Sequence, residues 1–216
     1  MENNKKTVSL KFDNMRTSIQ DPAASAQYGC LETPDLRYFG RSEQLHMGVR
    51  ALTKFFDDNN RYPNSEDEVN KVFALANELK PSDFELDEPV IKNLARYAQN
   101  SITSTCAFFG GIVAQEVVKY TGKYKPLKQW IHYDNFESLP ETANREPMNC
   151  RYDDQIRVYG REVQEKLGKV NTFMVGAGAL GCEYIKAMAL MGLGCGEGGK
   201  VSVTDNDTIE VSNLNR

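Results

Sequence analysis

The chain has 216 residues, and its 26 Lys and Arg residues against 30 Asp and Glu residues give a formal net charge of −4. This charge argues against a general nucleic-acid binder, because proteins that bind phosphate backbones usually carry a basic surplus. Hydrophobic residues make up 40% of the chain and charged residues 26%. That composition is typical of a globular protein and excludes disorder and collagen-like repeats.

The sequence also argues against a membrane span and a secreted protein. No apolar stretch approaches the roughly 20 residues that cross a bilayer, and the polar N-terminus leads into no apolar signal core. We therefore expect no membrane contact and a protein that stays inside the cell. The cysteines are odd in number and have no C-x-x-C pair, so we expect buried thiols. They are Cys30, Cys106, Cys150, Cys182 and Cys195.

The first elements in the chain are a strand and a helix. Residues 5–12 alternate polar and apolar, which predicts a half-buried strand. From Ser42 the apolar residues recur at steps of three and four, which predicts a helix with Ser42 as its N-cap. The polar cluster at 57–60 ends this helix. Its apolar stripe is Leu45, Val49, Leu52 and Phe56.

Two more helices follow. Ser65 and Glu68 form a capping box, and the apolar stripe behind them runs to Pro81. A third amphipathic stripe begins after Pro89. The region from about 16 to 100 is therefore predicted to be a small helical bundle.

The next segment is apolar on all sides. Residues 103–120 predict a buried helix, with Gly110 and Gly111 allowing close packing and Gly122 near its C-terminal end. Residues 130–133 then predict a strand.

His132 in that strand has three interpretations: a metal ligand, a general base, or a structural histidine. No acid, thiol or second histidine lies at a supporting spacing, so we favour a structural histidine at a strand end. Residues 138–150 contain two prolines, several charges and no periodicity, which predicts a linker. A second globular unit is expected to begin near Arg151.

The motif that carries chemistry is a G-x-G-x-x-G sequence between a strand and a helix. Residues 172–175 predict the strand, and Gly176, Gly178 and Gly181 follow it directly. Such glycines permit a tight turn, let the backbone approach a phosphate, and let the next helix pack closely on its strand. The helix over about 179–191 would direct its N-terminal amides at the anion.

An acidic residue stands where a ribose could be bound. Residues 201–204 predict a second strand, and Asp205 follows it, 24 residues after Gly181. A carboxylate at that position can accept hydrogen bonds from ribose hydroxyls. The pattern predicts a nucleotide site, with an αβ unit that merely packs as the alternative. It leaves open whether the nucleotide is a dinucleotide or ATP.

A second glycine-rich stretch, at 192–199, precedes a strand instead of following one. We therefore expect a flexible surface turn in preference to a second phosphate loop. Cys195 within it has no neighbouring His or Lys to lower the pKa of its thiol, so we do not expect a nucleophile.

Residues 204–216, taken together with the glycine motif, closely resemble the adenylation signature of ubiquitin-activating enzymes. Residues 151–155 resemble the helix that opens each adenylation domain of that family, and residues 192–199 match its eukaryotic ubiquitin branch. The resemblance covers nearly the whole chain, because three upstream segments are also similar to that family: 44–48, 109–117 and 129–134.

The resemblance implies an α/β plus all-α fold class in four parts. Residues 1–15 would end a first catalytic-cysteine half-domain, and residues 16–100 would be a four-helix bundle. Residues 101–145 would be the C-terminal part of an inactive adenylation domain. Residues 151–216 would be the truncated N-terminal part of the active adenylation domain, which is Rossmann-like and of the ThiF/HesA type.

The resemblance also implies the chemistry. In the family, ATP and the C-terminal carboxylate of ubiquitin give an acyl-adenylate and pyrophosphate, and a cysteine then takes the acyl group as a thioester. By this resemblance the catalytic cysteine, and the domain that recruits ubiquitin-conjugating enzymes, lie outside this sequence. We therefore expect an internal fragment that is inactive alone, from a cytoplasmic and nuclear enzyme.

Residue roles follow from the resemblance position by position. Asp205 would hold the ribose, and Arg216 would stabilise charge that builds on the phosphates in the transition state. Asp207 would lie on the side of Mg²⁺, with a turn aspartate before Thr208 as the alternative. The positions that would bind the nucleotide are Gly176, Gly178, Ala179, Gly181, Asp205, Asn213 and Arg216.

Two other functions remain open at the level of sequence. A nicotinamide- or flavin-dependent oxidoreductase would use the same glycine turn, but it offers no reason for residues 212–216. A non-catalytic interaction module would use the helical bundle and bind no nucleotide.

Overall fold

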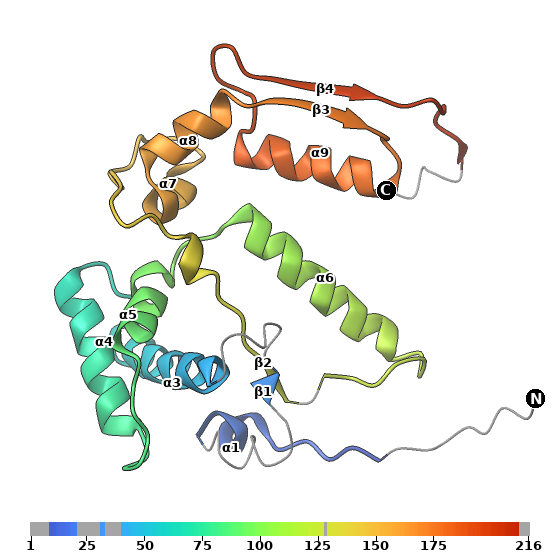
Figure 1. Cartoon of the computed structure of the whole chain (residues 1–216). Helices are drawn as coiled ribbons and strands as arrows, with labels where there is room; N and C mark the ends of the chain where they lie inside the picture. The colour runs from blue at the N-terminus through green and yellow to red at the C-terminus, as the bar shows by residue number, and fades with distance from the viewer. Residues whose placement is uncertain (1–8, 21–30, 33–39, 128, 212–216) are drawn as a thin grey trace, which may run out of the picture. The chain divides into compact units, whose positions relative to one another are not determined.

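The computed structural model describes residues 9–20, 31–32, 40–127 and 129–211, and the chain divides into two compact units (Figure 1). Unit 1 consists of residues up to 98 together with 119–136, and unit 2 of residues 99–118 together with those from 137 onward. The two units are described separately. Among the described residues, none of the helices has the length and apolar character that crossing a membrane requires.

Unit 1 is built on three helices in mutual contact, with a short helix and a pair of two-residue strands beside them. These elements are α1 (Met15–Gln20), β1 (Leu31–Glu32), α3 (Arg41–Asn59), α4 (Glu66–Leu79), α5 (Glu88–Tyr97) and β2 (Trp130–Ile131). Strands β1 and β2 are parallel, and both β1 and α1 contact α3.

The predicted helix starts and stops are largely confirmed. The Ser65 hydroxyl accepts from the Glu68 N–H at 3.3 Å and caps α4, as the capping box predicts. Helix α3 ends at Asn59, and Asn60 follows it in the left-handed conformation. Ser42 is not the N-cap, however. The N-cap is Gly40 at φ 80°, two residues earlier, and the helix begins at Arg41, so Ser42 is buried inside the first turn.

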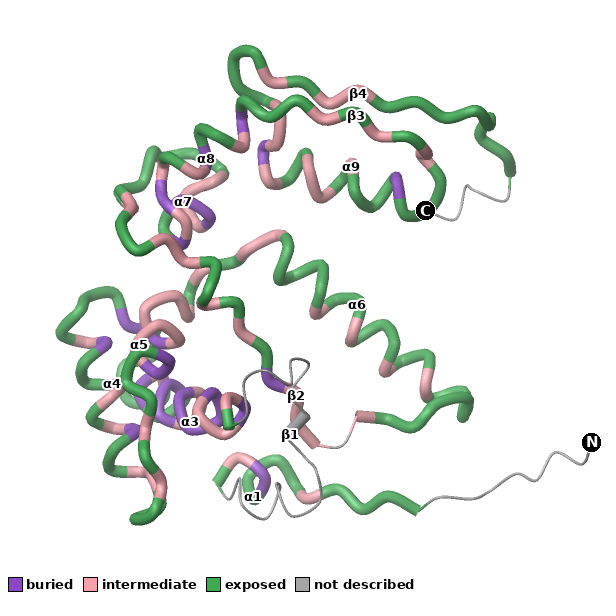
Figure 2. Tube along the Cα trace, viewed as in Figure 1, coloured by how far each residue is buried: buried purple, intermediate pink, exposed green. Residues whose placement is uncertain are grey.

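The core of unit 1 lies where α3, α4 and α5 meet (Figure 2). Its fully buried side chains include Ala51, Ala76 and Ile91, each with no exposed surface. An ion pair on the surface joins two of the helices: Arg96 Nε donates to Glu66 Oε1 at 2.6 Å, and its Nη2 donates to the other carboxylate oxygen at 2.7 Å. Of the stripe predicted for α3, Leu52 lies in this core, whereas Val49 and Phe56 are half-buried. Ala51 and Phe55 contribute instead.

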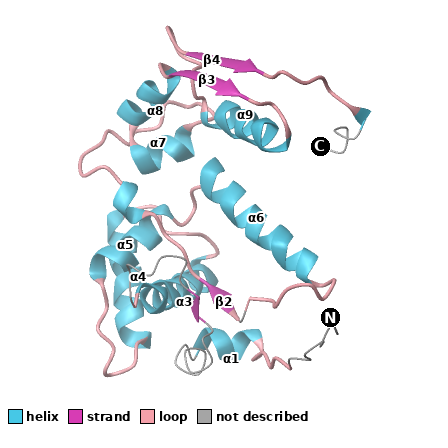
Figure 3. Cartoon of the chain, turned by 45° about the vertical axis from the view of Figure 1, so that its right-hand side comes forward, coloured by secondary structure: helices cyan, strands magenta, loops and turns pink. Residues whose placement is uncertain are grey.

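Unit 2 contains a two-stranded parallel sheet whose strands are joined by a helix (Figure 3). Strand β3 pairs with β4 over their whole lengths, from Asn171 opposite Lys200 to Val175 opposite Thr204. The elements from residue 103 onward, other than β2, are α6 (Thr103–Lys119), η1 (Phe136–Ser138), α7 (Asp153–Tyr159), α8 (Arg161–Gly168), β3 (Asn171–Val175), α9 (Ala179–Met191) and β4 (Lys200–Thr204).

The segment 139–150 contains no helix or strand, as expected of a linker, but it packs on α7 and α8. The Arg161 N–H donates to the carbonyl of Asn144 at 2.8 Å, and Arg161 Nε donates to the carbonyl of Glu146 at 2.7 Å. The segment therefore forms part of unit 2.

Helix α6 forms where it is predicted, and Gly122 follows it with φ 82°. The expectation that it is buried is wrong, since none of its residues is buried and Val113 and Val117 are 61% and 69% exposed. A Cβ at Gly110 or Gly111 would meet no atom within 4 Å, so these glycines allow no close packing. The reason is that no described helix or strand packs extensively against α6.

Two other expectations fail for related reasons. Residues 9–12 form no strand and carry Leu10 and Phe12 on the surface, while residues 5–8 lie outside the described residues. The predicted thiol burial is wrong at Cys106, Cys150, Cys182 and Cys195, which are exposed; Cys30 lies outside the described residues. Both expectations were based on local composition, which does not report whether another element covers a side chain.

The core predicts the effect of one truncation. We expect Ile91→Ala to lower the free energy of unfolding of unit 1 by about 2–4 kcal/mol, because it leaves a cavity among α3, α4 and α5. Urea unfolding followed by far-UV circular dichroism, which reports on the helices of the core, measures this change. The matched control is Ile209→Ala, at a position that is 84% exposed. Equal effects of the two substitutions would contradict the assigned core.

Candidate functional site

The glycine motif forms the turn that leads from β3 into α9. The Gly176 N–H donates to the carbonyl of Thr204 at 2.8 Å, so the turn is tied to the carboxyl end of the neighbouring strand. Gly176 has φ 100°, a conformation that side chains with a Cβ rarely adopt. The turn therefore needs glycine at its first position.

Gly181 holds the helix against the turn. A Cβ at this position would overlap the carbonyl oxygen of Gly176 and stand 3.0 Å from its carbonyl carbon. Both groups are backbone, so neither can move aside without displacing the turn. The third glycine of the motif thus sets how closely α9 approaches the end of β3.

The N-terminus of α9 is open. Gly178 is the N-cap and offers no side chain to the helix, so no side chain of this residue satisfies the first amides of the helix. A Cβ at Gly176 or Gly178 would meet no atom within 4 Å. Among the described residues nothing accepts from the first amides of the helix, and these amides, the positive end of the helix dipole and the space beside the two glycines together fit a phosphate group.

Asp205 follows β4 directly and lies at this turn. Its Oδ2 accepts from the Ala177 N–H at 2.5 Å, and its Oδ1 accepts from the Asp207 N–H at 2.9 Å. These backbone hydrogen bonds, the first above all, hold the pKa of the Asp205 carboxyl below its usual value. The structure thus brings together the glycine turn and the acid that sequence spacing singled out, and the acid is ionised at neutral pH.

Asp207 lies in the turn that follows. Its Oδ1 accepts from the N–H of the next residue, Thr208, at 3.3 Å, and its carboxylate is exposed. The described residues include no group of three or more His, Cys, Asp or Glu side chains that could hold a metal ion. Mg²⁺ bound with a nucleotide usually takes only one or two carboxylates besides the phosphates, so Asp207 fits a contributing ligand.

Asn213 and Arg216 lie outside the described residues. Their predicted contacts with phosphates therefore remain predictions. Sequence reasoning missed one neighbour of the turn, Cys182, whose thiol donates to the carbonyl of Ala177 at 3.1 Å. The sequence could have indicated this contact, because Cys182 falls in the first turn of the helix predicted after the glycines.

The second glycine-rich stretch is a turn that connects α9 to β4, at the opposite end of the two strands from Gly176. It is held by backbone contacts: the Gly196 N–H donates to the carbonyl of Gly168 at 2.8 Å. Cys195 donates its thiol proton to the carbonyl of Gly192 at 2.9 Å. The place and bonding of this turn support a structural connection in preference to a second phosphate loop.

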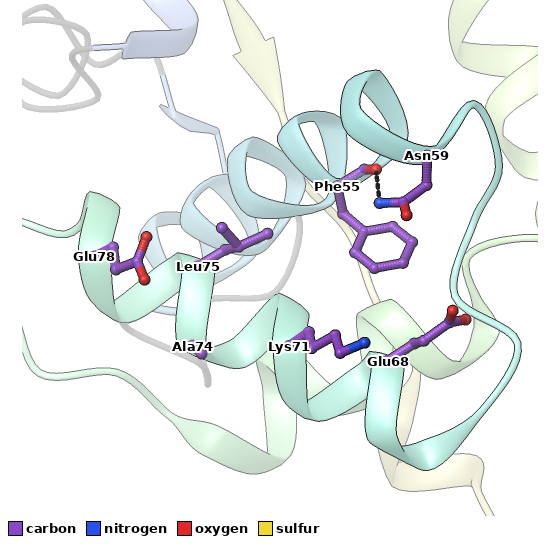
Figure 4. A pocket seen from close by; sticks show the side chains of 7 residues that line it. All are labelled: Phe55, Asn59, Glu68, Lys71, Ala74, Leu75 and Glu78. Carbon is purple, nitrogen blue, oxygen red and sulfur yellow. Dashed lines mark hydrogen bonds between the residues drawn. The ribbon is translucent and has the colours of Figure 1, made fainter.

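A pocket of about 310 Å³ lies in unit 1 between α3 and α4. Figure 4 shows the Phe55 ring pointing from α3 towards α4, with Asn59 Nδ2 donating to the Phe55 carbonyl at 2.8 Å. The pocket is lined by Phe55, Asn59, Glu68, Lys71, Ala74, Leu75 and Glu78. Its lining contains no histidine, cysteine or hydroxyl side chain.

His132 directly follows β2 and is buried, as expected of a structural histidine at a strand end. The expectation that no second histidine supports it is wrong. His46 on α3 lies beside it, with His46 Nδ1 3.2 Å from His132 Nε2. The two residues are 86 positions apart in the chain, so sequence spacing could not pair them.

The fold and the site define a class of protein. A parallel strand pair, a glycine turn into a helix and an acid at the end of the second strand are the arrangement typical of Rossmann-like nucleotide-binding units, here in one chain with a helical bundle. The model of the ThiF family matches residues 152–216. The model of the ubiquitin-activating enzyme E1 four-helix bundle matches residues 6–80.

Three relatives extend these matches to nearly the whole chain. Ubiquitin-like modifier-activating enzyme 1 of Homo sapiens is 44% identical, and ubiquitin-activating enzyme E1 1 of Schizosaccharomyces pombe is 41% identical. Ubiquitin-activating enzyme E1 1 of Arabidopsis thaliana is 38% identical. Each alignment covers 96% of this chain. The chain belongs to the ubiquitin-activating enzyme family, and it spans about a fifth of the length of these relatives.

The close approach of α9 to the turn predicts an unusual effect of alanine. Gly→Ala inside a helix normally stabilises it by about 0.5–1 kcal/mol. We expect Gly181→Ala to destabilise unit 2 instead, by roughly 2 kcal/mol or more, because the new Cβ overlaps the backbone of Gly176. Thermal unfolding followed by far-UV circular dichroism measures the change.

The control is Gly110→Ala, which lies inside α6 of the same unit with nothing within 4 Å of its Cβ position. This control should be neutral or stabilising. A stabilised Gly181→Ala variant would show that the turn is not packed as described.

Proposed function

We propose that this chain is a segment of an enzyme that activates ubiquitin by ATP-dependent adenylation, and that it carries the nucleotide turn of the active site. The observation that supports this most is the hydrogen bond of 2.5 Å between the Ala177 N–H and Asp205 Oδ2. It joins the two parts of a nucleotide site, a phosphate-binding turn and a carboxylate for the ribose. The names of the relatives supply the substrate.

In this proposal each residue of the site has one task. The amides of residues 178–181 bind phosphate oxygens of ATP, and Asp205 accepts hydrogen bonds from the ribose hydroxyls. The carboxylate of ubiquitin then attacks the α-phosphorus, and the bond to pyrophosphate breaks. Arg216 stabilises the charge that builds on these oxygens, together with Asn213, and Asp207 contributes to Mg²⁺.

The domain organisation is part of the same proposal. Residues 1–15 end a catalytic-cysteine half-domain, 16–100 form the four-helix bundle, 101–145 belong to an inactive adenylation domain, and 151–216 start the active one. The cysteine that forms the thioester and the surface that receives ubiquitin-conjugating enzymes lie in other parts of the enzyme. The enzyme works in the cytoplasm and the nucleus.

A titration of the ¹⁵N-labelled chain tests the nucleotide. We expect ATP to shift the amide signals of Gly176, Gly178 and Gly181, and Asp205→Asn to weaken this binding about tenfold or more, because a charged hydrogen-bond acceptor is lost. Asp207→Asn, measured without Mg²⁺, is the matched control and should change the affinity less than twofold. NAD⁺ shifting the same amides in place of ATP would favour an oxidoreductase, and no response to either nucleotide would favour an interaction module.

An exchange assay tests the claim that the chain is a segment of the catalytic machinery. With ATP, Mg²⁺ and ubiquitin present, we expect the isolated chain to give no sustained ATP–pyrophosphate exchange, because the residues of the other domains are needed. Exchange above that of the Asp205→Asn variant would contradict this claim.

A further inference from the structure

The two histidines of the chain form a buried pair that the nucleotide chemistry does not use. His46 is 2% exposed and His132 is 9% exposed. Their rings are edge to face, with centroids 5.2 Å apart. His46 comes from α3 and His132 from the segment that follows β2, so the pair joins elements that are far apart in sequence.

A third element also depends on this pair. His46 Nε2 lies 3.1 Å from the carbonyl oxygen of Ile19 in α1. A carbonyl only accepts, so Nε2 of His46 carries a proton. A neutral imidazole has a single N–H, which makes Nδ1 of His46 an acceptor, and Nε2 of His132 must donate to it. Both neutral tautomers are thereby assigned.

This arrangement has no good place for an additional proton. On His132 the proton would go to Nδ1, which is buried and has no hydrogen-bond partner among the described residues. On His46 it would go to Nδ1, and His132 Nε2, 3.2 Å away, could accept from it only if the proton of His132 moved to Nδ1. Protonation of either ring therefore puts a positive charge in a buried pair and a proton on His132 Nδ1, which has no acceptor among the described residues, and both are costly.

Among the residues that the structure describes, no carboxylate contributes to the pKa shifts of the two rings. Burial lowers the pKa of His132 to about 4, with a smaller contribution from His46. Burial also lowers the pKa of His46, against the backbone of Ile19 and Ser18, and Arg50 lowers it further. Arg41 at the start of α3 and Asp134 in the segment after β2 form an ion pair, at 3.7 Å, in which the carboxylate is already matched by a cation.

We propose that the His46–His132 pair is an acid-sensitive latch: while both rings are neutral it holds α1 and β2 on α3, and protonation releases them while the α3–α5 core stays folded. The sign follows from linkage. The unfolded histidines take up protons near their ordinary pKa of 6.5 and the folded ones only at lower pH, so stability of the latch falls as the pH drops from 6.5 towards 4.

The core of unit 1 contains no other histidine that could titrate in this pH range, because His46 and His132 are the only two in the chain. Its surface carboxylates Glu66 and Glu68 are paired with arginines, which lower their pKa values, that of Glu68 to about 2. The core therefore tolerates acid to a lower pH than the latch does.

Trp130 reports directly on the latch. Its ring centroid is 5.8 Å from that of His46 and 6.3 Å from that of His132, and the chain has no other tryptophan. We expect its emission to change with a midpoint between pH 6.5 and 4, while far-UV circular dichroism stays nearly constant over this range. Constant emission, or a simultaneous loss of helix, would overturn the proposal.

Two variants identify the titrating group. His132→Gln keeps an N–H for His46, and its amide can rotate to offer oxygen to a protonated His46, so the transition should disappear. Asp134→Asn removes the neighbouring carboxylate and should leave the transition in place. The opposite result for either variant would overturn the proposal.

A measurement on the unmodified chain covers the case in which a variant does not fold. The ring Cε1–H signals of the two histidines should titrate by NMR below their ordinary pKa of 6.5. A histidine that titrates at or above this value would overturn the latch.

Discussion

The close approach between Gly181 and the carbonyl of Gly176 is the constraint on which the candidate site depends. It allows α9 to begin directly at the end of β3, so that the amides of its first turn face outward from the carboxyl end of the sheet. The parallel register of β3 with β4 places Asp205 at that same edge. Because Gly181 has no side chain, α9 can pack against the turn, and the turn lies beside the Asp205 carboxylate that would bind a ribose.

The candidate site keeps a side chain charged, whereas the bundle keeps two titratable side chains neutral. At the turn, Asp205 is kept ionised by two backbone N–H groups, which suits a residue that accepts hydrogen bonds from a ligand. In unit 1, His46 and His132 are kept neutral by burial, which suits a contact that holds elements together. In both places the number of donors and acceptors within reach decides which protonation state is stable.

Local sequence predicted those features that local physics controls. The helices of the bundle follow from apolar periodicity and from caps such as Ser65, and the nucleotide turn follows from glycines whose spacing has a steric reason. Burial was predicted less well. Helix α6 is apolar all round and yet exposed, because exposure depends on which other element covers a surface and not on the segment itself.

The histidine pair shows the same limit for a site. His132 lies buried directly after β2, as expected of a histidine at a strand end. Its partner lies 86 residues earlier in the chain, and only the folded arrangement brings the two rings together. In the same way, the spacing of Asp205 from the glycines indicated a ribose carboxylate. It did not reveal that Ala177 already donates to that carboxylate.

The central claim is that the turn at Gly176–Gly181 and Asp205 form one nucleotide site. A crystal structure of the chain soaked with ATP tests it most directly. The account predicts phosphates against the amides at the N-terminus of α9 and the ribose hydroxyls within hydrogen-bond distance of Asp205. ATP bound away from this turn, for example in the pocket between α3 and α4, would contradict it.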